Sequence, residues 1–225
     1  MRIAELFHSI QGEGRLAGVP SVFVRTSGCN LRCWFCDTPY TSWHPEGAER
    51  SVDDLFREII GVGCEHVVVT GGEPMLVNDV VLLTERLRAA GRHITIETAG
   101  TADLPVAADL MSISPKLSNS TPIDADWTVR HDERRHRPDV IRRLTGEYDY
   151  QLKFVIDRPD DVGDVERWLA EFPEVPRGRV YLMAQATDRD LLTEKSQWLA
   201  EIVKSRGWRL SPRLHVDLWG NTRGT

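Results

Sequence analysis

Three of the four cysteines of the chain, Cys29, Cys33 and Cys36, fall within eight residues. Thiols at this spacing are typical of metal ligands, iron–sulfur ligands or a redox dithiol. A structural zinc ion needs a fourth ligand, which His44 could supply, but the first gap of three residues differs from the usual zinc-knuckle spacing. A redox dithiol would use only Cys33 and Cys36 and would leave Cys29 without a role.

Three thiolates also suit a four-iron cluster, because they leave one iron without a protein ligand. That open iron can bind a substrate or a cofactor. The fourth cysteine, Cys64, lies at the entrance of a strand predicted at residues 65–70. About six extended residues place it on the order of 20 Å from the other end of that strand, where chemistry is expected. We therefore expect Cys64 to be a small buried thiol and the cluster to keep its open iron.

The elements that must position these cysteines are short β-branched runs that alternate with longer helical patterns. Strands are predicted at residues 21–26, 65–70, 93–98, 109–114, 151–156, 179–183 and 209–216. Helices are predicted at about 52–60, 78–90, 159–172 and 188–206, the first opened by the capping sequence SVDD at 51–54. The alternation predicts an α/β fold with a mostly parallel sheet, open or curled into a partial barrel, in one domain covering residues 1–225.

The residues whose side chains could do chemistry fall at the ends of predicted strands or just after them. The cysteines follow the first strand and residues 71–74 (GGEP) the second, residues 97–100 (ETAG) end the third, and residues 114–116 (SPK) follow the fourth. Because ligands collect where the carboxyl ends of parallel strands meet, we expect one face of the sheet to carry the whole site.

Composition narrows the function classes. The net charge of −6 argues against broad electrostatic binding to nucleic acid, and the mixed-sign run at 130–137 is typical of a solvated surface. No apolar run approaches the roughly 18 residues of a membrane span, and the first residues lack the pattern of a signal peptide. A cytoplasmic protein with a small-molecule substrate and no membrane partner is expected.

The spacing Cys29-x3-Cys33-x2-Cys36, with residues 71–74 (GGEP) some 35 residues later, resembles the radical S-adenosylmethionine (SAM) superfamily. The resemblance implies a partial (β/α) barrel and a [4Fe–4S] cluster on the three cysteines. It also implies that the amine and carboxylate of SAM chelate the open iron, and that an electron from the cluster gives a 5′-deoxyadenosyl radical, which abstracts hydrogen from carbon.

A narrower resemblance covers nearly the whole chain. Its motifs are residues 7–14 (FHSIQGEG), 36–38 (CDT), 69–74 (VTGGEP), 96–98 (IET), 112–116 (SISPK) and 218–221 (LWGN). They are similar to the 7-carboxy-7-deazaguanine synthases of queuosine and other 7-deazapurine pathways. The resemblance implies conversion of 6-carboxy-5,6,7,8-tetrahydropterin to 7-carboxy-7-deazaguanine with loss of ammonia, catalytic use of SAM, and a requirement for Mg²⁺. It further implies a homodimer and an electron donor such as flavodoxin or ferredoxin.

The resemblance also assigns site residues. Substrate contacts are expected from Ile10, Gln11, Gly12, Arg25 and Thr70. SAM contacts are expected from Gly72, Glu73, Ser114, Pro115, Lys116 and, where the chain departs from the family pattern, Gln185.

Three of the assigned roles have a physical alternative. Thr38 would bind Mg²⁺ beside the substrate carboxylate, although Asp37 is the better candidate by charge. Arg25 could pair with that carboxylate or close the sheet with a salt bridge. Glu97 is expected in the site as a substrate contact, a proton-transfer group or a buried satisfied carboxylate.

Two other function classes stay open at this stage. A glycyl-radical-enzyme-activating protein shares the cysteine spacing and would act on a partner protein. A noncatalytic zinc or iron–sulfur module would bind metal without turnover.

Overall fold

The computed structural model describes residues 1–225 and contains one nine-stranded sheet in the order β3-β1-β2-β4-β5-β6-β7-β8-β9. Neighbours from β2 to β9 are parallel, whereas β1 is antiparallel to β2 and β3. The strands are β1 (Arg2–Ile10), β2 (Pro20–Thr26), β3 (Ala48–Glu49), β4 (His66–Gly71), β5 (His93–Thr98), β6 (Leu110–Ile113), β7 (Tyr150–Ile156), β8 (Val180–Ala184) and β9 (Arg209–Ser211). This α/β architecture, an open partial barrel, confirms the predicted fold class.

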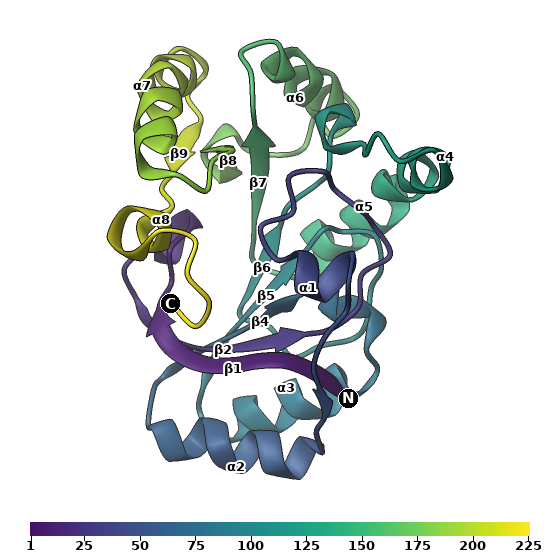
Figure 1. Cartoon of the computed structure of the whole chain (residues 1–225), viewed down its shortest axis with the longest axis vertical. Helices are drawn as coiled ribbons and strands as arrows, with labels where there is room; N and C mark the ends of the chain where they lie inside the picture. Colours follow the sequence, from purple (N-terminus) through teal and green to yellow (C-terminus); the bar gives the residue numbers. More distant parts are fainter.

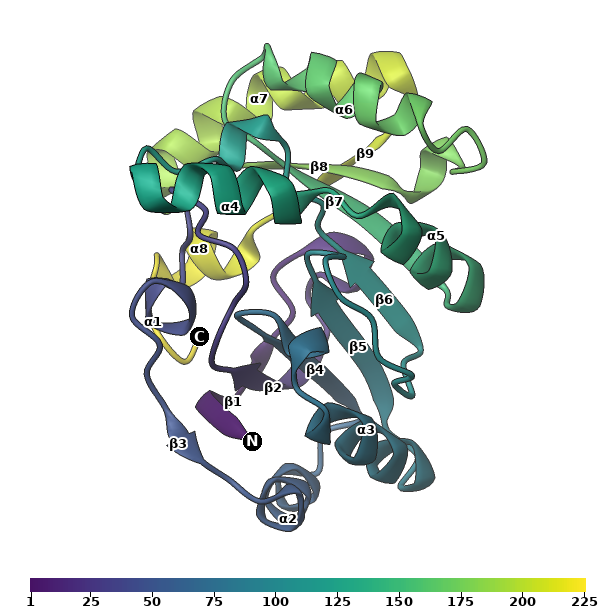
Figure 2. The same cartoon turned by 90° about the vertical axis from the view of Figure 1, so that its right-hand side faces the viewer.

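Eight α-helices accompany the sheet: α1 (Pro39–Ser42), α2 (Val52–Val62), α3 (Asp79–Ala89), α4 (Ala125–Arg135), α5 (Pro138–Glu147), α6 (Asp161–Ala170), α7 (Arg189–Arg206) and α8 (Leu214–Trp219). Figures 1 and 2 show α2 and α3 outside the β4–β5 part of the curved sheet, with α5, α6 and α7 outside the β6–β9 part. The hydrophobic core fills the space between these helices and the strands. No helix combines the length and the apolar character that crossing a membrane requires.

Local sequence explains several element boundaries. Ser51 caps α2, because its side chain accepts a hydrogen bond from Asp54 N at 3.1 Å. Gly63 ends that helix in the left-handed conformation, with φ 76°. The run Val67–Val69 in β4 is buried throughout, as expected for a parallel strand covered on both faces.

The strand predicted at 209–216 is wrong beyond Ser211. The chain leaves the sheet at Pro212, which has no N–H for the ladder, and continues as α8. Strand β1 and helices α4 and α5 were not among the predicted elements. The first two have weak patterns, because β1 is a mixed-polarity strand near the sheet edge and α4 buries only His131.

Candidate active site

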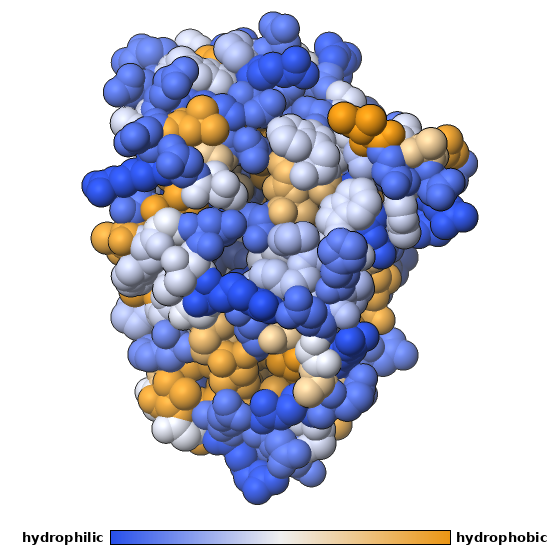
Figure 3. All heavy atoms as spheres, viewed as in Figure 1, coloured by the Kyte–Doolittle hydropathy of each residue, from blue (hydrophilic) through white to orange (hydrophobic).

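Two cavities open at the carboxyl ends of the parallel strands. The larger has a volume of about 370 Å³ and the smaller about 180 Å³. The residues that line both are Glu13, Asp37, Thr38, Thr70, Gly71 and Glu97. The cavities therefore share a wall, and Figure 3 shows a hollow bordered mostly by polar side chains near the middle of this face of the molecule.

Cys29, Cys33 and Cys36 all line the smaller cavity. Burial raises the pKa of Cys29 and of Cys33 to about 12, so iron must displace a proton from each thiol on binding. No three His, Cys, Asp or Glu side chains surround a single metal-ion position. A cubane cluster needs no such point, because each thiolate binds a different iron. Three thiols around one cavity therefore fit a four-iron cluster.

Cys64 lies at the opposite end of the sheet from this cavity. Its thiol donates to the carbonyl of Pro20, the first residue of β2, at 3.2 Å, whereas the other cysteines follow the last residue of that strand. It packs partly buried against the hydrophobic core. The predicted separation of Cys64 from the other three thiols is confirmed.

The cysteine loop is held on its outer side by the 3₁₀ turn Ser118–Ser120 and by α4. Arg32 N donates to His131 Nδ1 at 3.1 Å, and His131 Nε2 is 2.9 Å from Ser120 Oγ. Trp34 donates from its backbone and its indole to the carbonyls of Ser120 and Asn119, at 3.3 and 2.6 Å. Burial lowers the pKa of His131 to about 4, so the ring is neutral and can accept from Arg32.

Gly72 packs directly against the start of the cysteine loop. A Cβ at this position would lie 2.0 Å from the carbonyl oxygen of Gly28. The next residue, Glu73, donates its N–H to the same carbonyl at 2.9 Å. The glycine is therefore required by contact between two protein loops, whether or not it also approaches SAM.

The carboxylate of Glu73 lies behind the cavity wall. It is fully buried and accepts from Met75 N at 3.1 Å, and from Thr98 Oγ1 and Ala99 N at 2.8 Å each. Burial raises the pKa of Glu73 despite these hydrogen bonds. Glu73 thus ties the end of β4 to the end of β5, and its expected SAM contact stays a prediction.

Of the other expected SAM contacts, Ser114, Lys116 and Gln185 line the smaller cavity and Pro115 lines neither. Lys116 Nζ donates to the carbonyl and the hydroxyl of Ser114, at 2.6 and 2.8 Å. The side chain of Gln185 is held by Lys195, whose Nζ lies 3.3 Å from Gln185 Oε1. The three polar residues thus reach one cavity from two different strand ends.

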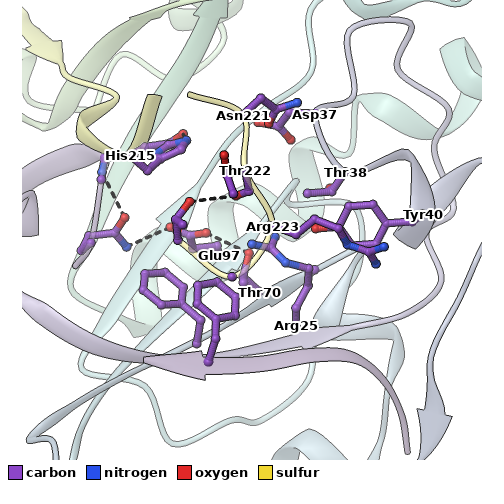
Figure 4. Close-up of a pocket in the computed structure, with 18 of the residues that line it drawn as sticks. Arg25, Asp37, Thr38, Tyr40, Thr70, Glu97, His215, Asn221, Thr222 and Arg223 are labelled. Atoms are coloured by element: carbon purple, nitrogen blue, oxygen red, sulfur yellow. Dashed lines mark hydrogen bonds and ion pairs between the residues drawn. The ribbon is translucent and has the colours of Figure 1, made fainter. Parts of the chain in front are cut away.

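All five expected substrate contacts line the larger cavity. On one side Glu97 accepts from Gln11 Nε2 at 3.1 Å and from Thr70 Oγ1 at 2.8 Å. Gln11 Oε1 in turn accepts from Glu13 N at 3.0 Å. Figure 4 shows Glu97 at the centre of this group, opposite Arg25, Thr38, Tyr40 and Arg223.

Arg25 takes part in the salt bridge that was predicted as its alternative role. Its Nε donates to Glu5 Oε2 at 2.7 Å, and Tyr40 donates its hydroxyl to the same oxygen at 2.6 Å. Arg25 nevertheless lines the larger cavity, as does Thr38. The salt bridge therefore orients the guanidinium at the cavity and leaves its other nitrogens available.

Sequence reasoning missed several residues of the site. Lys153 and Arg213 contribute positive charge beside Glu13, the carboxylate of the predicted QGEG loop, and His215 contributes a ring whose pKa burial lowers. Residues 221–225 line part of the larger cavity. Burial opposes the charge of Glu13, but attraction by Lys153 and Arg213 outweighs it and holds the pKa of that carboxyl far below its usual range. A lysine inside the apolar strand QLKFVI was the one available signal.

A model of the radical SAM superfamily matches residues 23–117. A 7-carboxy-7-deazaguanine synthase from Halobacterium salinarum is 47% identical and aligns over 99% of this chain and 92% of its own length. The chain belongs to the 7-carboxy-7-deazaguanine synthase family. A further synthase of this family, from Rhodopirellula baltica, is 44% identical over 99% of this chain and 88% of its own.

The crystal structure of QueE from Escherichia coli has the same fold, with a TM-score of 0.70 and 26% identity over 93% of this chain and 92% of that one. Membership of the synthase family favours the first of the three function classes that the sequence left open. The cofactors of the radical SAM superfamily, to which this family belongs, are a [4Fe–4S] cluster and SAM. The three cysteines of the smaller cavity are the expected ligands of that cluster.

Proposed function

We infer that this chain converts 6-carboxy-5,6,7,8-tetrahydropterin to 7-carboxy-7-deazaguanine with loss of ammonia, as a radical SAM carbon–nitrogen lyase. The observation that carries this assignment is the polarity of the larger cavity beside the three cysteines. Glu97 and the amide of Gln11 lie on one side of that cavity, and Arg25, Arg223 and Thr38 on the other. The substrate has matching ends, because its amino-pyrimidinone edge carries N–H donors and its far end a carboxylate.

On the acidic side the substrate edge would donate to the free lone pairs of Glu97 and to backbone around Ile10 and Gly12. Thr70 and Gln11 hold the Glu97 carboxylate from both sides, so its position is set before the substrate enters. Phe7 and Phe23, stacked with ring centroids 5.0 Å apart, also line this cavity and offer a flat apolar surface to the pterin ring.

On the basic side Arg25 would pair with the substrate carboxylate, because Glu5 already fixes the direction of its guanidinium. Thr38 would bind Mg²⁺ beside that carboxylate. A neutral hydroxyl suits Mg²⁺, which commonly takes few protein ligands and completes its octahedron with water and substrate oxygens. Thr38 lines both cavities and therefore suits a metal that bridges enzyme and substrate.

The smaller cavity would hold the cluster on Cys29, Cys33 and Cys36, with SAM against Gly72, Ser114, Lys116 and Gln185. The chemistry that these groups supply when bound is a 5′-deoxyadenosyl radical, which can remove hydrogen from carbon. The protein's part is to hold the pterin against the shared wall, so that one carbon faces the smaller cavity. A misplacement of about 1 Å there can cost on the order of a hundredfold in rate.

The rest of the proposal concerns the domain, its assembly, its electron donor and its compartment. We assign the activity to one domain, residues 1–225, that works as a homodimer and receives electrons from a flavodoxin or ferredoxin. A reducing compartment keeps thiols free for iron, which favours the cytoplasm.

An anaerobic assay tests the function. Reconstituted protein is incubated with dithionite, SAM, Mg²⁺ and the carboxytetrahydropterin, and the deazaguanine product is sought by its mass. Because the family reaction uses SAM catalytically, product should exceed SAM consumed. Stoichiometric release of 5′-deoxyadenosine during productive turnover would count against the assignment.

A further inference from the structure

Arg213 lines the smaller cavity and contacts three different loops. It is 4% exposed and comes from the short connection between β9 and α8. Its Nε lies 3.2 Å from Glu13 Oε1, its Nη1 donates to the carbonyl of Ala186 at 2.5 Å, and its Nη2 pairs with Asp37. One planar guanidinium therefore joins the loops that follow β1, β2 and β8.

Two of these contacts belong to opposite halves of the site. Asp37 stands between Cys36, an expected iron ligand, and Thr38, the expected Mg²⁺ ligand. Glu13 follows the residues expected to contact the substrate, and its N–H donates to Gln11. Arg213 thus connects the cysteine loop to the substrate-binding loop through side chains alone.

The connection is reinforced on the substrate side only. Leu214 N donates to the carbonyl of Gly12 at 3.0 Å, and Ser211 Oγ accepts from Gly14 N at 2.9 Å. Lys153 supplies a second cation to Glu13 from β7 and makes no contact with Asp37. Of the two cations on Glu13, Arg213 is therefore the one that also holds Asp37.

We propose that Arg213 is a positioning residue that fixes the cysteine loop relative to the substrate-binding loop, so that the radical meets the intended carbon of the substrate. This role rests on the function proposed above. Glu13 and Asp37 each line both cavities, so a shift of either carboxylate changes the spacing of the two ligands across the shared wall.

The test compares Arg213→Lys, which keeps the charge but loses the planar fork, with Asp37→Asn and with the matched control Lys153→Gln. The first readout is the rate at which an iron chelator removes iron from the oxidised, reconstituted enzyme without SAM or substrate. The second readout is 5′-deoxyadenosine released per product formed during turnover.

Arg213→Lys and Asp37→Asn should each release iron about fivefold faster than the parent and raise 5′-deoxyadenosine per product about tenfold, because misplacement by a fraction of an ångström favours abortive cleavage. Combining them should add little, since both break one bridge. Lys153→Gln should weaken substrate binding, so its ratio is compared with the parent's at saturating pterin. There its iron release and its ratio should stay close to the parent values, because the contact of Arg213 with Asp37 is kept.

A parent value of either readout in Arg213→Lys would overturn the proposal, as would an equal rise of the ratio in Lys153→Gln. If Arg213→Lys fails to fold, as judged by circular dichroism, Asp37→Asn decides by the same criteria. A parent enzyme that makes no product would contradict the proposed function instead, and chelator-driven iron release alone would then decide the role of Arg213.

Discussion

The expected cluster ligands and the expected substrate-binding residues differ in how far apart they lie in the sequence. The three cysteines fall within eight residues, although the cavity that they line also takes residues from Glu13 to Arg213. The residues expected to bind substrate run from Ile10 to Glu97 and line a cavity that takes residues from Phe7 to Thr225. The cluster half is thus a local motif on one loop, and the substrate half exists only after β1, β5 and the C-terminal segment come together. Substitutions in the first half should remove a function outright, and those in the second should give graded losses.

The largest effect is expected at the cysteines. Alanine at Cys29, Cys33 or Cys36 should abolish the brown four-iron species and all turnover, because each thiolate holds one iron. Cys64→Ala should keep roughly four irons per chain, since its thiol lies at the other end of β4. Iron analysis and the visible spectrum after reconstitution make the comparison, and equal iron loss in Cys64→Ala would contradict the open-iron cluster.

A substitution in the wall that the two cavities share should cause a large but incomplete loss of product formation. Thr38→Ala should leave iron content and SAM cleavage largely intact and slow product formation on the order of a hundredfold, because Mg²⁺ at the proposed site would lose its protein ligand. Thr38→Ser keeps the oxygen and should recover much of the rate.

Magnesium titration of chelator-treated enzyme separates this role from a purely structural one. If Thr38→Ala has the parent's rate and Mg²⁺ midpoint, Thr38 is only a loop residue. The metal site would then be sought first at Asp37.

A graded effect is expected within the larger cavity. Glu97→Gln keeps the shape of the side chain but replaces one acceptor oxygen and the negative charge with an NH₂ group. The two oxygens accept from Gln11 and Thr70, and the substrate edge is expected to donate to their remaining lone pairs, so the substitution weakens both sets of hydrogen bonds. Hydrogen bonds to a charged group contribute about 1.5–3 kcal/mol, so KM for the pterin should rise about tenfold or more. Steady-state kinetics provide the measurement, with iron content as the control. An unchanged KM with a lost kcat would make Glu97 a proton-transfer group.

The smallest effect on turnover is expected at His131, behind the cysteine loop. Its pKa of about 4 lies below the ordinary 6.5, so the unfolded chain binds the proton more tightly. The stability that neutral His131 contributes is therefore complete above about pH 6.5. It is lost as the pH falls toward 4, by on the order of 3 kcal/mol.

Urea unfolding of the cluster-free protein at pH 7.5, 5.5 and 4.5 measures this loss. His131→Gln should be less stable than the parent at pH 7.5, with a difference that narrows as the pH falls. His44→Gln, at an exposed position, should follow the parent at every pH. A constant difference between His131→Gln and the parent would exclude the buried neutral ring as the cause.

Much of the fold could be predicted, because parallel strands covered on both faces have continuous apolar runs in the sequence. The strand at 93–98 is confirmed at both ends, and those at 65–70 and 151–156 within one residue at each end. The prediction failed at 209–216, where an apolar pattern continues past Pro212 although the ladder cannot. Strand β1 was not predicted because its residues are of mixed polarity. Its place near the sheet edge, next to the two-residue strand β3, is defined only by pairing with β2.

The sequence by itself determined the cluster half of the site. Three thiols on one short loop need only that loop, and the expected ligands at residues 71–74 and 114–116 follow predicted strands whose carboxyl ends must meet at one edge. Their approximate positions follow from local pattern and sheet geometry.

The tertiary structure decided how the two halves are joined. Arg213 lies far along the chain from both Glu13 and Asp37, and no local pattern indicates which carboxylate a buried arginine will meet. Only the packing of α8 against the loop after β1 brings these charges together. Burial makes Arg213 and Glu13 each require a partner, whereas Asp37 remains partly exposed. The carboxylates of Glu13 and Asp37 are thus held by ion pairs with a residue far away in the sequence, and no local sequence pattern predicts such pairs.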